Sequence, residues 1–317
     1  TKIMNDGHIK MWPFFDESWR IFENTAIKQK LRYTIIMCNS EDIQDELDIY
    51  ELKKEIKMIT IKSDREIEGM KASGAIIAGM HKGLRDIIKP GISTWEIEEF
   101  GRKYIEDHGA RAAQIGFEGF EFATTVSVNN EVAHGFPRKG LILKDGDLVK
   151  VDTVVDLDGY YSDSAWTYAV GEVSPEIKRL MDVTLKALYL GIDQAVVGNR
   201  IGDIGAAIDA YVTDENGFGN VREYIGHGIQ PTMHEEPAVP AYGVAGHGLR
   251  LKPGMTITIE PMVNVGGWKV DTSEEDGWTV TTEDGSWSAQ YEHTIAITND
   301  GPKILTSQDS EFDAKYL

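Results

Sequence analysis

The sequence predicts an α+β protein built from two related halves, each consisting of two helices followed by strands. One helix pair is expected over residues 64–109 and the other over residues 174–215. At an offset of 107 residues the two pairs share glycine, apolar and aromatic positions. Each pair precedes strand-like sequence that contains a histidine. Two such halves would place a functional site at their junction.

The first helix pair follows a change in sequence pattern at Met58. A capping box at residues 63–66 opens a helix that we expect to reach about residue 88, and Pro90 with Gly91 ends it. A second capping signal at residues 93–96 opens a helix that closes near Gly109. The capping boxes therefore fix both starting points.

The second helix pair repeats this layout. Ser174 and Pro175 start a helix to about residue 197, Gly198 breaks it, and another helix is expected over residues 201–215. The internal similarity is weak and rests on four matches. These are Gly91, Ile97, Tyr104 and Asp107 with Gly198, Ile204, Tyr211 and Asp214.

Residues 148–170 predict a β-hairpin that turns at Asp158-Gly159, because this dipeptide accepts the positive φ angles of a type I′ turn. Side-chain alternation then places Asp152 on the same face as Asp163, with Cβ atoms about 7 Å apart. The hairpin alone leaves two interpretations open: a solvated face, or two carboxylates that share a cation. The two-residue turn sets the register as Leu157 with Tyr160, Val155 with Ser162 and Val154 with Asp163.

Three further strands are expected over residues 121–128, 255–263 and 289–298. In the last two, polar and apolar residues alternate, which gives each strand one polar face. Glu260 lies on the polar face of one, and Glu292 on that of the other. Two more carboxylates are thus available to a shared site.

Composition narrows the class of function. The chain has 317 residues, a formal net charge of −20 and a single cysteine, Cys38. The charge argues against nucleic acid or an anionic membrane as the main partner, and we expect a cytoplasmic protein. One cysteine excludes a disulfide framework or a cysteine-based zinc module within the chain. Any metal must therefore be held by oxygen and imidazole.

Residues 1–57 do not resemble the remainder, and we expect a poorly defined N-terminal extension followed by one domain, residues 58–317, that carries the function. We also expect the natural chain to begin at Met58 and the extension not to be native. Lys54-Glu55 can be encoded AAG GAG, a purine-rich ribosome-binding sequence, with Ile56-Lys57 as its spacer.

Five dispersed residues are candidate metal ligands: Asp152, Asp163, His227, Glu260 and Glu292. Four carboxylates and one imidazole suit divalent ions such as manganese, iron, cobalt or zinc. With two bridging carboxylates they would hold two ions about 3.5 Å apart, the spacing at which a metal pair activates a shared hydroxide.

The sequences around these residues resemble the metal-site segments of type I methionine aminopeptidases. The segments are LKDGDLVKVDTVVDLDGYYSDSAWTYAVG, GHGIQPTMHEEP, MTITIEPMVN and WSAQYEHTIAIT, and SVNNEVAHGFP resembles the segment of the family's first substrate histidine. They occur in family order, and the resemblance covers about residues 58–306. As a set the segments are highly specific.

The resemblance implies the pita-bread fold, in which two pseudo-symmetric helix-and-sheet halves surround a central metal site. It assigns Asp152 and Asp163 to one metal. It assigns Asp163, His227, Glu260 and Glu292 to the other, and Asp163 and Glu292 would bridge the two. It implies that His134 and His234 face the scissile amide, and that Glu260 also shuttles a proton toward the departing amine.

The resemblance also implies a narrow apolar pocket for methionine. Phe117 and Phe120 match a family pocket wall, and Thr125, Met233 and Trp278 fall at further pocket positions. Many members have cysteine at the positions of Ala133 and Thr125 and phenylalanine at that of Met233. These departures should change pocket shape and thiol sensitivity but not the reaction.

The leading interpretation is an enzyme that removes the initiator methionine from nascent proteins, with two divalent ions per chain. We expect it to act as a monomer on peptide or nascent-protein N-termini, and contact with the ribosome stays open. One alternative is a proline-directed aminopeptidase, against which the pocket segment and the short N-terminal region argue. The other is a non-catalytic binding protein of the same fold, which would be expected to have lost ligands.

Overall fold

The computed structural model describes residues 59–317. The chain divides into two units, Thr1–Ile56 and Lys57–Leu317, and the expected extension over residues 1–57 lies outside the described residues. None of the helices in the described range has the length and apolar content that a membrane crossing requires.

The four expected long helices are present. They are α3 (Asp64–Ile87), α4 (Thr94–Asp107), α5 (Pro175–Asp193) and α6 (Ile201–Asp209), and α6 continues as a π-helical turn, η3 (Ala210–Glu215). Both predicted capping boxes form: the Ser63 and Ser93 side chains accept hydrogen bonds from the third helical residue, whose glutamate bonds back. A short 3₁₀ turn, η2 (Phe117–Gly119), and a C-terminal helix, α7 (Ser310–Asp313), complete the helices of the described chain.

The described strands form four antiparallel sheets. One sheet joins β4 to β5, β1 and β2, and another runs β15-β14-β9-β7-β8. Two three-stranded sheets have the orders β13-β10-β6 and β11-β12-β3. The strands are β1 (Arg111–Ala112), β2 (Thr125–Val128), β3 (Glu131–Ala133), β4 (Leu148–Leu157), β5 (Tyr160–Ala169), β6 (Gly219–Asn220), β7 (Gly226–Gly228), β8 (Glu235–Val239), β9 (Thr256–Ile259), β10 (Met262–Asn264), β11 (Val270–Thr272), β12 (Val280–Thr282), β13 (Ser288–Gln290), β14 (His293–Thr298) and β15 (Gly301–Ile304).

The predicted hairpin register is confirmed. Leu157 pairs with Tyr160 and Val154 with Asp163 across β4 and β5. The turn residues Asp158 and Gly159 both have positive φ, 54° and 85°, as a two-residue turn of this type requires. The turn chemistry therefore fixes which face carries each aspartate.

Two expected strands are each divided in two, and a third is shorter than expected. The strand expected over residues 255–263 is β9 and β10, separated at Glu260 and Pro261. The one expected over residues 289–298 is β13 and β14, separated at Tyr291 and Glu292. Proline has no amide hydrogen to donate to a ladder, and the Glu292 amide donates instead to Ala165 O on β5 at 2.9 Å. The strand expected over residues 121–128 contains only β2 as regular structure.

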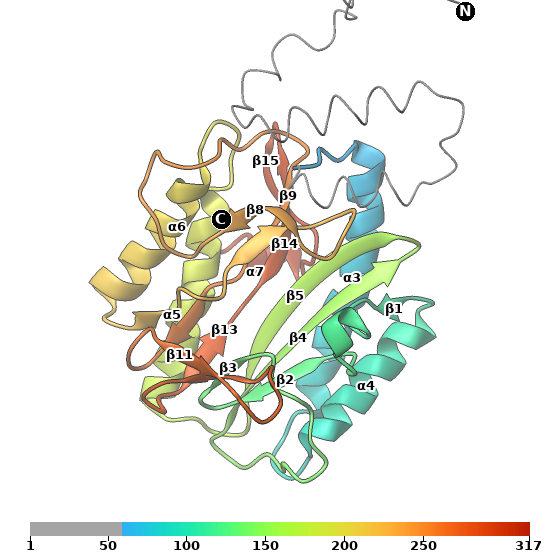
Figure 1. Cartoon of the computed structure of the whole chain (residues 1–317), viewed down its shortest axis with the longest axis vertical. Coiled ribbons are helices and arrows are strands. Elements are labelled where there is room, and N and C mark those ends of the chain that lie inside the picture. The colour runs from blue at the N-terminus through green and yellow to red at the C-terminus, as the bar shows by residue number, and fades with distance from the viewer. Residues whose placement is uncertain (1–58) are drawn as a thin grey trace, which may run out of the picture. The chain divides into compact units, whose positions relative to one another are not determined.

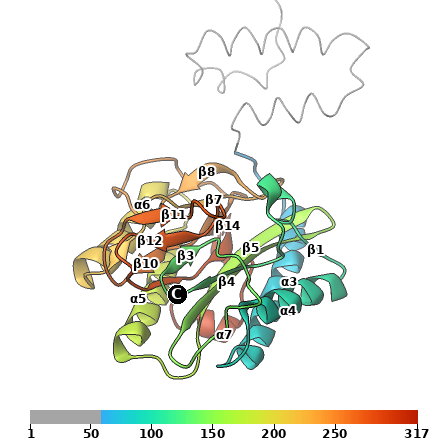
Figure 2. The ribbon, with the colours of Figure 1, turned by 60° about the horizontal axis from the view of Figure 1, so that its bottom comes forward.

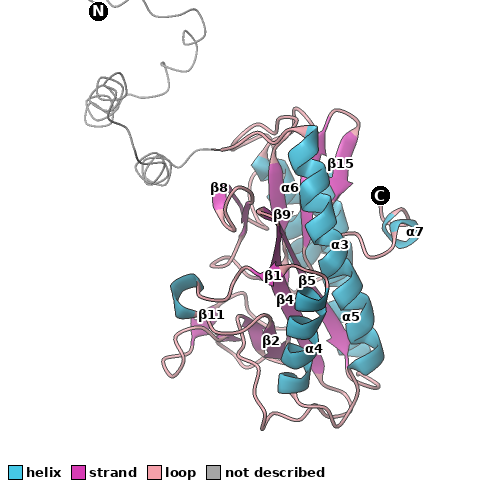
Figure 3. Cartoon of the chain, turned by 90° about the vertical axis from the view of Figure 1, so that its right-hand side faces the viewer, coloured by secondary structure: helices cyan, strands magenta, loops and turns pink. Residues whose placement is uncertain are grey.

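The long helices α3, α4, α5 and α6 lie on one side of the strands, as Figure 3 shows, with β8 and β11 on the opposite side. Figure 1 shows α3 and α4 on the right and α5 and α6 on the left. Figure 2 shows the same layers from another direction, with β4 and β5 beside α3 and α4. One large apolar cluster, which includes Ile77, Ile97, Leu188 and Ile204, joins both helix pairs to the strands. Burial of this surface is the main favourable contribution to folding.

The internal repeat is visible in the backbone. Gly91 precedes α4 with φ of 100°, and its counterpart Gly198 precedes α6 with φ of 98°. Ile97 and Ile204 are both fully buried on the second helix of their pair. The weak sequence similarity thus marks equivalent structural positions in two halves.

Candidate metal centre and substrate cavity

The candidate ligands come together where the two halves meet. A cavity of about 350 Å³ is lined by all five of them and by both candidate substrate histidines. The first half contributes β4 and β5, while the second contributes β7 and the segments around Glu260 and Glu292. The described chain therefore assembles the site from segments far apart in sequence.

Asp152 and Asp163 project from neighbouring strands of the hairpin. Asp152 pairs with Ala165, and Asp163 pairs with Val154, so the aspartates are diagonal neighbours. Desolvation raises the pKa of both carboxyl groups, and repulsion from Asp163 raises that of Asp152 further. The Asp163 backbone is fixed by Thr294, which accepts from its amide at 2.9 Å and donates to its carbonyl at 2.8 Å.

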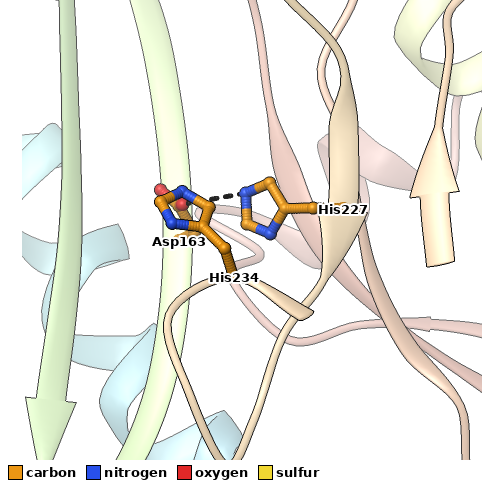
Figure 4. Close-up of side chains that lie close together, drawn as sticks. All are labelled: Asp163, His227 and His234. Carbon is orange, nitrogen blue, oxygen red and sulfur yellow. Dashed lines mark ion pairs between the residues drawn. The ribbon is translucent and has the colours of Figure 1, made fainter. Parts of the chain in front are cut away.

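His227 approaches Asp163 from β7. Its Nδ1 donates to Gly228 O at 2.9 Å, which leaves Nε2 with a free lone pair. Nε2 lies 3.6 Å from Asp163 Oδ2, the contact marked by the dashed line in Figure 4, and 3.8 Å from Glu260 Oε1. This tautomer directs the nitrogen that can bind a metal at the carboxylates.

The two glutamates occupy the breaks between strands. Glu260 accepts a hydrogen bond from Thr258 Oγ1 at 3.0 Å and one from Gln290 Nε2 at 3.4 Å. Glu292 is 1% exposed. Burial raises the pKa of both groups, and repulsion from Asp163 adds to the shift. Without added positive charge, four ionised carboxylates would repel one another here.

The donor set fits divalent cations. Three buried carboxylate oxygens, Asp152 Oδ1, Asp163 Oδ1 and Glu292 Oε1, have no hydrogen-bond partner among the described residues. One oxygen from each of these residues lies within 4.8 Å of the other two, and the same holds for donor atoms of His227, Glu260 and Glu292. Two such groups sharing Glu292 match the chemistry of a pair of hard or borderline ions.

His134 and His234 line the same cavity as this cluster. The His234 ring is 4.3 Å from that of His227, and all three side chains in Figure 4 converge. Desolvation lowers the pKa of both histidines, and repulsion from His227 lowers that of His234 further. Both rings are therefore neutral near pH 7, able to donate or accept a hydrogen bond.

Aromatic side chains join both histidines to the predicted methionine pocket. Phe117 lies 5.4 Å from His234, and Trp278 lies 6.1 Å from His134, measured between ring centroids. Phe120 is 3% exposed and its ring is 5.0 Å from that of Trp278. Phe120 and Trp278 form one aromatic wall, and Phe117, which is 41% exposed, contacts His234 instead. None of the three is among the residues that line the 350 Å³ cavity.

The other two predicted pocket residues, Thr125 and Met233, are also buried. Thr125 pairs with Asp152 between β2 and β4, so its side chain shares the face of that aspartate. Met233 is 8% exposed and packs in an apolar cluster with Val154 and Ile229. Neither lines the cavity.

Several residues of the site escaped the sequence reasoning. Phe122 and Phe136 extend the wall, with ring centroids 5.6 and 5.4 Å from that of Phe120. Tyr224 lines the cavity, and its ring is 5.4 Å from that of His134. Their positions gave a signal, since Phe136 lies two residues after His134 and Tyr224 lies three before His227.

Comparisons with known proteins agree with this geometry. The profile of metallopeptidase family M24 matches residues 68–299. Methionine aminopeptidase 1 of Bacillus subtilis is 47% identical over 249 residues, 78% of this chain and 99% of that protein. A streptococcal methionine aminopeptidase structure is 51% identical with a TM-score of 0.74, covering 80% of this chain and 99% of that one. The structure of the Rickettsia prowazekii methionine aminopeptidase is 41% identical with a TM-score of 0.77, covering 79% of this chain and 100% of that one.

Proline-directed relatives are more distant. An Xaa-Pro dipeptidase from Bacillus anthracis is 24% identical with a TM-score of 0.63, a likeness of fold alone, and this chain covers 64% of its length. The pita-bread fold is therefore shared widely, whereas high identity over nearly the whole relative is found with the methionine enzymes. The chain belongs to metallopeptidase family M24, among its methionine aminopeptidases.

Proposed function

We propose that this protein removes the N-terminal methionine from newly made proteins in the cytoplasm, using two divalent metal ions held at the junction of its halves. The observation that carries the proposal is the convergence of four carboxylates, an imidazole and two neutral histidines in one cavity. Three of the carboxylate oxygens lack a partner within the described chain.

Asp152 and Asp163 would hold one ion, while Asp163, His227, Glu260 and Glu292 would hold the other, with Asp163 and Glu292 bridging. When bound, such a pair lowers the pKa of water and polarises a carbonyl oxygen. Four carboxylates of net charge −4 would offset two dications, so the occupied site carries little net charge. This balance supports two ions rather than one.

The remaining chemistry belongs to side chains. Glu260 would accept a proton from the attacking water and deliver it to the departing amine. His134 and His234 would bond to the scissile amide, and a contact that strengthens as charge develops on the carbonyl oxygen accelerates the reaction. Their lowered pKa values keep both rings neutral, so they bind without adding charge.

Substrate choice would follow from charge and shape. A free amino terminus can bind at the metal–carboxylate cluster, so N-terminally blocked peptides would be refused. Phe117, Phe120 and Trp278 offer a methionine thioether apolar contact and sulfur–aromatic attraction, each contact contributing about 0.3–1.5 kcal/mol. A lysine side chain would leave its ammonium without a partner against this wall.

The test uses metal-stripped protein and each divalent ion added back in turn. Met-Ala-Ser, Lys-Ala-Ser and Arg-Pro-Pro are compared under each condition. We expect metal-dependent cleavage of Met-Ala-Ser and almost none of the other two. Faster cleavage of Arg-Pro-Pro than of Met-Ala-Ser would refute the methionine specificity. Cleavage by the metal-stripped protein would refute the role of the ions.

A further inference from the structure

We propose that Lys62 and Glu235 are positioning residues: their buried ion pair fixes the loop that carries His234, and so sets where this histidine meets the substrate. The inference rests on the proposed role of His234 in the reaction. It assigns a function to the segment just before α3, which contributes nothing to the metal cluster itself.

The contacts converge on one carboxylate oxygen. Lys62 Nζ forms an ion pair with Glu235 Oε1 and lies 3.3 Å from Thr60 O. The Thr60 hydroxyl lies 2.8 Å from the same Glu235 oxygen and 2.9 Å from Gln230 O, and its one proton can serve either acceptor. Residues 60 and 62 thus hold both ends of the loop 230–235.

Burial makes this pair different from a surface ion pair. The Lys62 side chain is 2% exposed and that of Glu235 is 9% exposed. Lys62 is shielded from solvent and Glu235 reaches it only at the cavity lining, so removing the lysine leaves a largely buried carboxylate without its cation. By contrast, the pair between Lys103 and Asp107 on α4 has side chains that are 74% and 57% exposed.

The backbone of Lys62 is also hydrogen-bonded to a segment next to β14. The Lys62 amide donates to Gly254 O at 2.7 Å, and the Gly254 amide donates to Ile297 O on β14 at 2.9 Å. The segment of Lys62 is therefore bonded to the same sheet as β7, the strand of one candidate ligand, His227.

His234 depends on its neighbours for its orientation. Within the described residues its ring makes no hydrogen bond, and it lies between the rings of Phe117 and His227. Its own carbonyl accepts from Thr232 Oγ1 at 2.9 Å. Both neighbours of His234 are held by their side chains: Met233 packs in an apolar cluster, and Glu235, which begins β8, makes the polar contacts to Thr60 and Lys62.

The far end of the loop is attached to the hairpin of the two aspartates. Gln230 Oε1 accepts from the Tyr161 amide at 3.0 Å, and Gln230 Nε2 donates to Gly159 O at 3.1 Å. The loop is thus fixed to the hairpin at Gln230 and to the N-terminal segment at Glu235. The backbone of Glu235 also pairs with Gly228 on β7, so loss of the ion pair would leave the ladder in place but would remove the charged side-chain contact beside His234.

The experiment compares Lys62→Met, Lys62→Arg and Glu235→Gln with the control Lys103→Met. Methionine keeps much of the length of lysine without its charge, whereas arginine keeps the charge. A displacement of about 1 Å at a reacting group can cost about 100-fold in rate. We expect Lys62→Met to lower kcat on Met-Ala-Ser by about 10- to 100-fold with KM and bound metal little changed. Lys62→Arg should recover part of the loss, and Lys103→Met should match the parent.

A second readout does not depend on turnover. The ring signals of His234, assigned in the ¹⁵N-histidine spectrum with His234→Ala, should shift or broaden in Lys62→Met while those of His81 stay unchanged. A parent protein that does not cleave Met-Ala-Ser would refute the proposed function, and this spectrum would still test the positioning. Unchanged kcat and an unchanged His234 signal in Lys62→Met would overturn the inference. If Lys62→Met does not fold, Glu235→Gln decides by the same two criteria.

Discussion

Glu260 and Glu292 occupy facing breaks in the strands of the second half. β9, which ends before Glu260, pairs with β14, which begins after Glu292. β10, which begins after the first break, pairs with β13, which ends before the second. Two neighbouring segments of the chain thus interrupt their pairing at facing positions, and each has a glutamate there. A continuous ladder would space these side chains by its pleat alone, whereas the breaks let Glu292 reach the aspartates of the hairpin and Glu260 reach His227.

Asp163→Asn should lose bound metal and nearly all activity while keeping its fold. Asparagine preserves the volume but removes a charge that would offset two dications. Activity should fall below about one-hundredth of the parent, which exceeds the usual cost of losing an outer contact to a metal ligand. Metal content and hydrolysis of Met-Ala-Ser check this, with the exposed Asp182→Asn as control. Two metals bound as tightly as in the parent would show that the bridging assignment is wrong.

His227 and His234, whose rings lie 4.3 Å apart, should have different functions. His227→Ala should reduce metal affinity, because it removes the imidazole nearest Asp163 and Glu260. His234→Ala should keep its metals and lose about 2.7–4 kcal/mol of transition-state stabilisation, the cost of one such contact. Metal titration combined with kcat measurements distinguishes them, and the opposite pattern would exchange their roles.

The metal-stripped protein should become less stable as pH rises from about 4 to about 7. Burial raises the pKa of Asp163 from 3.8 to about 7 and that of Glu260 from 4.5 to about 7. In this window the unfolded chain has already released protons that the folded chain retains, so the free energy of unfolding falls with pH. Thermal melts at several pH values measure this slope. Asp163→Asn should reduce it, and an equal slope in the variant would contradict the assignment.

The first residues of the domain should matter more than the extension before them. A variant beginning at Met58 keeps Thr60 and Lys62 and should retain full activity. One beginning at Ser63 loses both and should show the reduced kcat expected for Lys62→Met. Activity measurements on both, with folding checked by circular dichroism, test this. Loss of activity in the Met58 variant would mean that residues 1–57 contribute to function.

Local chemistry made the hairpin and the helix starts predictable. Asp158-Gly159 permits only a tight turn, so the facing of Asp152 and Asp163 followed from the sequence. Helix ends were less certain: α5 ends at Asp193, four residues before the expected end, because the amides of Gln194 and Ala195 already bond to carbonyls three residues back. Glycine at 198 marked the next turn rather than the end of the helix.

The site itself depended on contacts that no local pattern encodes. Alternation predicted that Glu260 and Glu292 lie on polar faces, but only the resemblance placed them with His227. The break at Tyr291 and Glu292 arises because the Glu292 amide bonds to Ala165 on β5, which a single strand does not reveal, whereas Pro261 could have indicated the other break. Lys62 and Glu235 are 173 residues apart, and neither stands out in sequence, since a lysine and a glutamate are usually solvated.

The division of the site between halves has a consequence for engineering. Asp152 and Asp163 precede the exposed turn at Gly171 and Glu172, whereas His227, Glu260 and Glu292 follow it. A chain cut at this turn yields two fragments, each with an incomplete set of donors. Reassociation would be needed before either metal could be held with its full set, so added divalent ions would favour the joined pair over the separate pieces. The fold thereby offers a natural cut point for a split reporter whose reassembly is controlled by metal.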